Sequence, residues 1–295
     1  MATLHSDQYS FEPDMDIIRQ QCDQVISGDA STRNRIEAAL RNLEVIKRHM
    51  ADGDGDKAFD KIRETMQDIM DLEVDELKAS CSFYMGFLML TVSRDNAEMT
   101  QKSLEVIHWA LQLTRNPMLA LATYNKLMIH HLNHQNYEMV IKLVDATHEV
   151  ASGLPRSNVI AYYRAAANYN KAEAFFRQNQ FPEVLSPGKD AMDGFREISM
   201  ETESAKCKGL VGFAMIATGD KTRGLEYTEE SLRHFQRLKN EKEVAFLLQG
   251  RGMVMLMNGD KQEAIQNLRE AVNIFRRSGD INAVNNTLAF LSNVE

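Results

Sequence analysis

The second half of the sequence repeats itself at a fixed spacing. The segment GDKTRGLEYTEESLRHFQRL, which begins at Gly219, aligns with GDKQEAIQNLREAVNIFRRS, which begins at Gly259, at an offset of 40 residues. The offset continues upstream, where Asn179 takes the place of the two glycines. A period of this size is typical of arrays in which each repeat is one supersecondary unit. We expect these three residues to adopt the left-handed backbone conformation that commonly ends a helix.

Apolar residues recur with a helical period along nearly the whole chain. Only five prolines and fifteen glycines interrupt this pattern. We predict helices over residues 14–27, 31–51, 57–71, 73–92, 99–114, 118–134, 137–151, 157–178, 182–198, 200–218, 221–238, 240–257, 261–277 and 281–293. The short breaks between them predict antiparallel neighbours. Pro187 falls inside one predicted helix and is expected to kink or shorten it.

Small residues recur at the places where the paired helices would cross. They are Ala172, Gly212 and Gly252 before the turn, and Ala191, Ser231 and Ala271 after it. In this register the chain resembles the tetratricopeptide repeat (TPR) family over about residues 73–280. It departs from the family in its longer period and in lacking the proline near the end of the second helix. The resemblance implies an all-α, right-handed superhelical solenoid of antiparallel helix pairs.

The quality of the repeat divides the chain into four parts. We predict a flexible polar tail, an N-terminal helical region formed by a diverged repeat, the TPR-like repeats and a C-terminal capping helix, over residues 1–13, 14–72, 73–280 and 281–295. The last segment places Ile281, Val284, Leu288 and Leu291 on one helical face. Such a face is expected to cover the apolar flank of the final repeat.

The composition limits the classes of partner. The chain carries 34 Lys plus Arg against 42 Asp plus Glu, a balance that favours neither phosphate backbones nor anionic lipid. We therefore expect no nucleic-acid and no membrane partner. The three cysteines are far apart and odd in number, which is typical of free thiols in a reducing compartment. The first thirteen residues lack the pattern of a signal peptide, so we predict a cytoplasmic protein.

Two segments have the residue types of a metal site without its full pattern. In Asp52-Gly53-Asp54-Gly55-Asp56 the carboxylates alternate as in a calcium loop, but Lys57 occupies the sixth position, where that loop needs glycine. His130 and His134 have the spacing of two ligands on one helix face, without a third ligand nearby. We predict an acidic turn and a polar helix end, and neither a metal nor a cofactor. No phosphate-binding glycine loop or nucleophile motif occurs, so we predict no catalytic residues.

The resemblance also indicates a binding surface. In the TPR family the concave face, lined by the first helix of each pair, receives partners. Carried over by register, the partner-binding residues are Asn125, Tyr169, Glu173, Phe176, Phe213, Ile216, Phe246, Gln249, Met253 and Met257. Asn125 and Tyr169 are the hydrogen-bonding candidates, while Phe213, Phe246, Met253 and Met257 form an adaptable apolar strip. Alternatively, these residues pack against one another or against the terminal helices.

These observations favour a non-catalytic scaffold or adaptor that binds a protein or peptide. A second hypothesis is a peptide-sensing regulator, because bacterial receptors for peptide pheromones resemble such a long-period array. A third makes the chain the regulatory module of a larger signalling enzyme. We expect a monomer or a homodimer, since an exposed terminal helix is a possible isologous contact.

Overall fold

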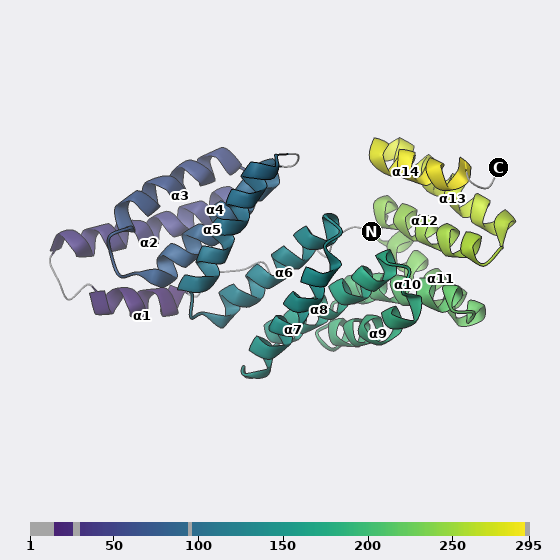
Figure 1. Cartoon of the computed structure of the whole chain (residues 1–295), viewed down its shortest axis with the longest axis horizontal. Coiled ribbons are helices and arrows are strands. Elements are labelled where there is room, and N and C mark those ends of the chain that lie inside the picture. Colours follow the sequence, from purple (N-terminus) through teal and green to yellow (C-terminus); the bar gives the residue numbers. More distant parts are fainter. Residues whose placement is uncertain (1–14, 26–29, 94–95, 293–295) are drawn as a thin grey trace. The chain divides into compact units, whose positions relative to one another are not determined.

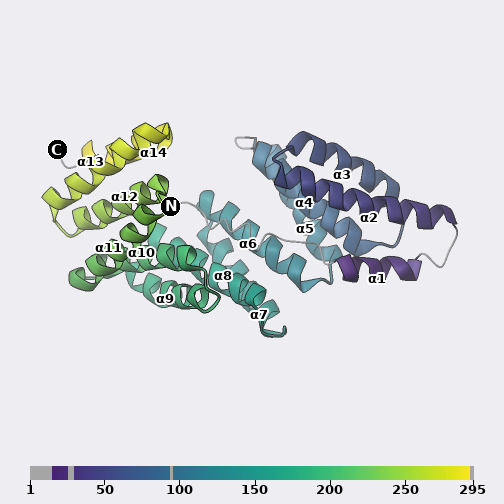
Figure 2. The same ribbon diagram turned by 180° about the vertical axis from the view of Figure 1, so that it is seen from behind.

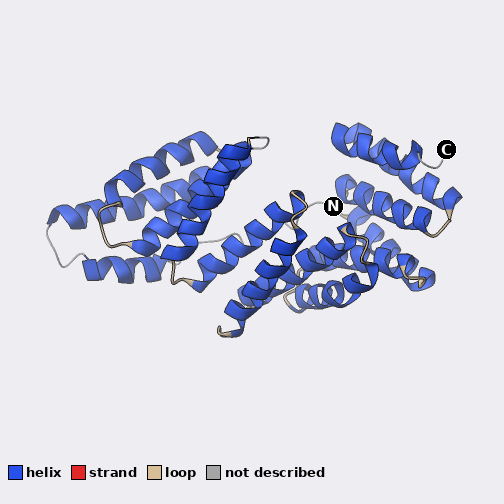
Figure 3. Ribbon diagram, viewed as in Figure 1, coloured by secondary structure: helices blue, strands red, loops and turns tan. Residues whose placement is uncertain are grey.

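The computed structural model describes residues 15–25, 30–93 and 96–292, and every regular element in these ranges is an α-helix (Figures 1 and 3). The helices are α1 (Met15–Val25), α2 (Ala30–Ala51), α3 (Gly55–Ile69), α4 (Asp75–Ser93), α5 (Ala97–Leu113), α6 (Pro117–Asn133), α7 (Tyr137–Ser152), α8 (Asn158–Arg177), α9 (Phe181–Glu197), α10 (Glu201–Ala217), α11 (Lys221–Arg237), α12 (Glu241–Met257), α13 (Lys261–Ser278) and α14 (Ile281–Ser292). Each corresponds to one predicted range, with small differences at the ends. The predicted tail, residues 1–13, lies outside the described residues.

The chain forms two compact units that divide within α6, between Thr123 and Tyr124. In the N-terminal unit α2 packs against α3, and α4 packs against α5. In the C-terminal unit α8 pairs with α9, α10 with α11, and α12 with α13, as both views show (Figures 1 and 2). The predicted all-α array of antiparallel helix pairs is confirmed. The predicted boundaries at residues 72 and 280 separate regions by how well they match the repeat. They stay predictions, because the division into two compact units does not test them.

The 40-residue period arises because each helix and its turn together take 20 residues. Helices α9 to α12 are 17 residues long and begin at Phe181, Glu201, Lys221 and Glu241. The turns contain residues with positive φ at Asn179, Ser199, Gly219, Lys239, Gly259 and Gly279. After each of them an N–H donates to a carbonyl five residues earlier, for example Asp220 to Met215 at 2.9 Å. The predicted left-handed turns at Asn179, Gly219 and Gly259 are confirmed, and this bond closes them.

The aligned positions of the repeat form its core. Phe195, Phe235 and Phe275 are all fully buried. The small residues one turn earlier, Ala191, Ser231 and Ala271, are fully buried as well. The Ser231 hydroxyl donates to the carbonyl oxygen of Ala205 at 2.7 Å, which satisfies the polar group inside the helix pair.

Pro187 does not shorten its helix. Helix α9 runs through it and is as long as α10, α11 and α12. Both Pro187 and Gly188 are buried. A Cβ on Gly188 would stand 2.7 Å from Cγ2 of Val211, so this pair lies where α10 approaches α9 closely. The ring of Pro187 is thus packed inside the unit, which offsets the lost backbone hydrogen bond.

Candidate partner-binding surface

The predicted surface belongs to the side of the C-terminal unit formed by α8, α10, α12 and the part of α6 that contains Asn125, here called the first-helix face. Side-chain caps fix where two of these helices begin. Ser157 accepts the N–H of Ile160 at 3.3 Å before α8, and Asn240 accepts the N–H of Glu243 at 3.2 Å before α12. These caps satisfy backbone donors that the first turn leaves unpaired, and so set the register of the residues that follow.

Five of the ten predicted partner-binding residues are buried in the C-terminal unit. The buried ones are Asn125, Tyr169, Glu173, Phe213 and Ile216. The ring of Phe213 crosses Gly250, where a Cβ would stand 2.6 Å from Cε2, and its centroid is 5.9 Å from that of Phe176. Phe213 therefore fills the space between α8 and α12. A partner does not reach its side chain in this conformation, so for Phe213 the structure follows the alternative that these residues pack against one another and not the open apolar strip.

The accessible part of the predicted strip is on α12. Met257 is 57% exposed, and Met253, one turn earlier on the same face, is half-buried. The other half-buried residues of the predicted surface are Phe176, Phe246 and Gln249. The ring of Phe246 meets that of Phe275 edge-on at 5.0 Å, so part of it is already covered by α13.

Polar contacts join α6 to α8, α10 to α12 and α12 to α14. Asn170 donates to the side-chain oxygen of Asn125 at 3.4 Å, and Arg177 donates to the carbonyl of Leu132 at 3.0 Å. Lys206 on α10 lies 3.1 Å from Glu243 on α12, and Gln249 on α12 donates to Thr287 on α14 at 2.9 Å. Asn125 and Gln249, which were predicted to bind a partner, thus bond to neighbouring helices.

Glu173 and Tyr169 are buried polar residues one turn apart on α8. One carboxylate oxygen of Glu173 lies 2.9 Å from Nε of Arg177, while Oε2 is buried without a hydrogen-bond partner. Burial raises the pKa of Tyr169 well above its ordinary value, and the negative charge of Glu173 raises it further. The phenol therefore stays protonated at neutral pH, so Tyr169 is unsuited to act as a base.

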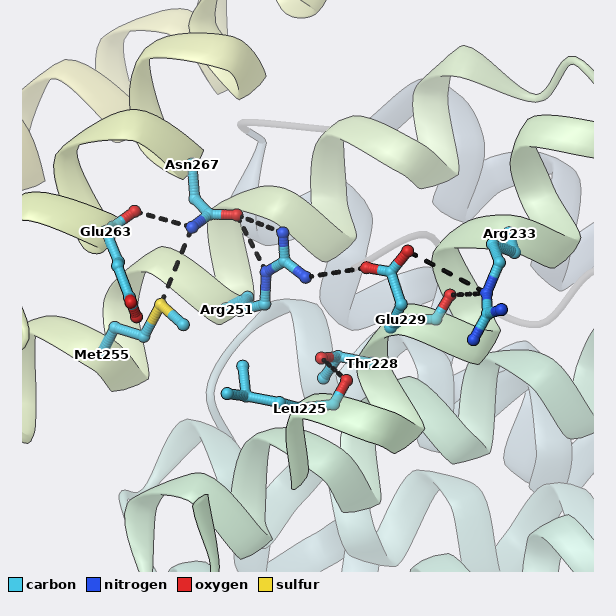
Figure 4. Close-up of polar contacts among 8 residues, drawn as sticks. All are labelled: Leu225, Thr228, Glu229, Arg233, Arg251, Met255, Glu263 and Asn267. Atoms are coloured by element: carbon cyan, nitrogen blue, oxygen red, sulfur yellow. Dashed lines mark hydrogen bonds and ion pairs between the residues drawn. The ribbon is translucent and has the colours of Figure 1, made fainter. Parts of the chain in front are cut away.

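A second polar group was not anticipated from the sequence. The guanidinium of Arg251 donates to Oδ1 of Asn267 at 2.8 and 2.7 Å and lies 3.3 Å from Glu229 (Figure 4). Asn267 in turn donates to the carbonyl of Glu263 at 2.7 Å. Arg251 thereby joins α11, α12 and α13. The sequence does contain a signal for this group. Arg251 is the one charged residue in the apolar segment LLQGRGMVML, and a buried charge needs a partner.

The segments considered for metal binding hold other contacts. Asp54 precedes α3 and pairs with Lys57 at 2.9 Å, without a side-chain capping bond. The rings of His130 and His134 lie 4.2 Å apart. Within the described ranges, no group of three or more His, Cys, Asp or Glu residues is placed to hold a metal ion. No helix among the described residues combines the length and apolar character that crossing a membrane requires.

Solved structures share this fold. A Rap protein complexed with competence and sporulation factor has a TM-score of 0.64 and 14% identity, covering 88% of this chain and 71% of its own. Aspartyl phosphate phosphatase F from Bacillus subtilis has a TM-score of 0.61 and 10% identity, covering 97% and 79%. BtubC (BKLC) from P. vanneervenii has a TM-score of 0.54 and 15% identity, covering 85% and 93%. No family model and no curated protein sequence matches the chain. At these identities the likeness concerns the fold.

Proposed function

We propose that this chain is a non-catalytic scaffold of the tetratricopeptide type that binds a protein or peptide on its first-helix face. The observation that carries the proposal is the pair Met253 and Met257. They present accessible apolar surface on a face whose other apolar side chains are mostly packed, and Met257 is 57% exposed. Unbranched thioether side chains adapt to different apolar partners. Three buried free thiols suit a cytoplasmic location.

The fold comparison supports a second candidate, a peptide-sensing regulator. The similar Rap protein was solved together with competence and sporulation factor. In this chain the first helices are joined by polar pairs such as Lys206 and Glu243, which a bound peptide could rearrange. A sensor of this kind changes conformation with its ligand, whereas a scaffold keeps its shape.

Site-specific photo-crosslinking tests the main proposal. A photoreactive phenylalanine derivative would replace Met257 in one variant and Leu238, which is 54% exposed at the end of α11, in a matched control. Expressed in the source cells, the first variant is expected to yield a defined crosslinked product that the second lacks. The same product from both positions, or none from position 257, would contradict binding on this face.

Ligand-linked stability verifies binding, and the shape of the protein with its ligand separates the two candidates. The partner sequence would be identified from the crosslinked product, and the corresponding peptide prepared. This peptide would be added to the wild-type protein at a hundredfold excess over its Kd, and unfolding of the protein by urea would be followed. Any ligand that binds only the folded state stabilises it by about 2.7 kcal/mol at this excess. Small-angle scattering then decides, because a sensor compacts with the peptide and a scaffold gives an unchanged profile.

A further inference from the structure

Helix α14 is packed into the C-terminal unit by one side. It lies against α13 (Figures 1 and 2). Its buried residues are Ala283, Thr287 and Leu291, which recur every four residues along one face. Leu291 belongs to an apolar cluster with Leu268 and Val272 of α13. This side fixes the position of the helix.

The opposite side of α14 carries four exposed residues, which we call the α14 stripe: Ile281, Asn285, Leu288 and Ser292. Their spacing of three or four residues places them on one face of the helix. Ile281 is 71% exposed and Leu288 is 36% exposed. A surface helix typically presents charged side chains on its outer face, yet α14 contains no charged residue. The α14 stripe is therefore apolar in part and neutral throughout, and it shares no residue with the predicted partner surface.

Comparison with the preceding first helix shows what covers such a stripe within the array. Forty residues earlier, the last three positions of the α14 stripe correspond to Ala245, Leu248 and Gly252 of α12, and all three are buried. A Cβ on Gly252 would stand 2.7 Å from Cγ of Leu268, so α13 covers that position closely. Helix α14 thus keeps the small and apolar pattern of a first helix, but no described helix covers it as α13 covers α12.

We propose that the α14 stripe is the contact between two copies of this chain. The second helix of a pair runs antiparallel to the first. A two-fold axis perpendicular to α14 supplies an antiparallel copy of α14 itself, and two-fold symmetry is the commonest symmetry of protein dimers. The inference goes beyond the proposed function and does not depend on it.

The order of residues along the stripe suits this symmetry. About such an axis Ile281 lies opposite the partner subunit's Leu288, and Asn285 lies close to the partner subunit's Asn285. An amide both donates and accepts hydrogen bonds, so the two Asn285 side chains can bond to each other. A single asparagine in an apolar helix contact also fixes its register. Because α14 is uncharged, the face meets its own copy without repulsion between like charges.

The contact is small, so we expect a reversible dimer. One helix of 12 residues from each subunit buries less surface than the roughly 1,200 Å² at which stable interfaces begin. We expect a dissociation constant on the order of 100 µM. Sedimentation equilibrium of the full chain, at concentrations below and above this value, should show monomer changing to dimer.

Substitution of one leucine tests where the dimer forms. Leu288→Glu places two carboxylates in the contact and should weaken dimerisation at least about tenfold, because facing like charges repel. The matched control is Leu238→Glu at the end of α11, where the leucine is 54% exposed. It should leave the dissociation constant within about twofold of wild type. Circular dichroism checks that both variants are folded.

Disulfide crosslinking tests the symmetry without relying on a disruptive variant. Asn285→Cys places a thiol near the proposed axis, and Asn282→Cys places one on α14 away from it. With copper phenanthroline as oxidant, the first should give a covalent dimer and the second should stay monomeric, since the native cysteines are buried. The proposal is wrong if wild type stays monomeric at every concentration, if both glutamate variants weaken the dimer equally, or if both cysteine variants crosslink equally.

Discussion

Gly212 and Gly224 face each other across the crossing of α10 and α11. A Cβ on Gly212 would stand 2.8 Å from the carbonyl oxygen of Gly224, and a Cβ on Gly224 would stand 2.6 Å from that of Gly212. Both obstacles are backbone atoms, which cannot rotate away. Only glycine at both positions allows the two helices to come this close.

We therefore expect Gly224→Ala to destabilise the protein by about 1 to 3 kcal/mol, because a methyl group must push the two helices apart. Urea unfolding followed by circular dichroism measures this change. Gly153→Ala is the matched control, since Gly153 has φ −82° and a Cβ there would stand 3.7 Å from its nearest neighbour, the carbonyl oxygen of Val150. The control is expected within about 1 kcal/mol of wild type. Equal effects at the two sites would contradict the close crossing.

Substitution of Lys206 and Glu243 tests how much the polar contact between α10 and α12 contributes to stability. Their side chains are only 13% and 10% exposed. Lys206→Met removes the cation and leaves a buried carboxylate, so we expect a loss of about 3 kcal/mol in the free energy of unfolding. The double variant Lys206→Met, Glu243→Leu removes both charges and should recover most of this loss. A double variant as unstable as the two single variants combined would show that the pair is not coupled.

The cysteines predict slow thiol chemistry. Cys22, Cys81 and Cys207 are fully buried, and burial raises the pKa of Cys22 to about 11 and that of Cys81 to about 12. The thiolate that reacts is therefore almost absent at pH 8. We expect no reaction with Ellman's reagent in the folded protein and three reacting thiols in urea. Rapid labelling of one thiol without denaturant would reveal local opening around it.

His130 makes stability depend on pH. Burial first, and then the nearby His134 and His131, lower its pKa from 6.5 to about 4. Between these values the unfolded chain takes up a proton that the folded chain resists, so stability falls as pH decreases from about 6.5 towards 4. His130→Gln removes this contribution. Unfolding in urea at pH 7 and pH 5 should show a smaller loss in the variant, and equal losses would contradict the lowered pKa.

The repeat in the sequence was sufficient to predict the helices, their pairing and the left-handed turns at Asn179, Gly219 and Gly259. Each of these depends on local periodicity or on comparison of one repeat with the next. The sequence left two alternatives for Phe213, an open strip or packing against its neighbours, because the choice depends on Gly250 and Phe176 on two other helices. The contacts of Arg251 likewise need three helices in place. Lys239 adopts the left-handed conformation without the glycine that usually marks it.

The pairing of Lys206 with Glu243 also limits how the chain can be shortened. By register, the same two positions one repeat earlier hold Ala166 and Glu203, which cannot form an ion pair. Deleting residues 200–239 would preserve every turn and helix length, yet it would bring Glu243 opposite Ala166. Glu203 already illustrates that setting, since burial raises its pKa. Repeats that are interchangeable in their backbone are therefore not exchangeable modules, because the Lys206–Glu243 pair forms only where these two repeats are neighbours.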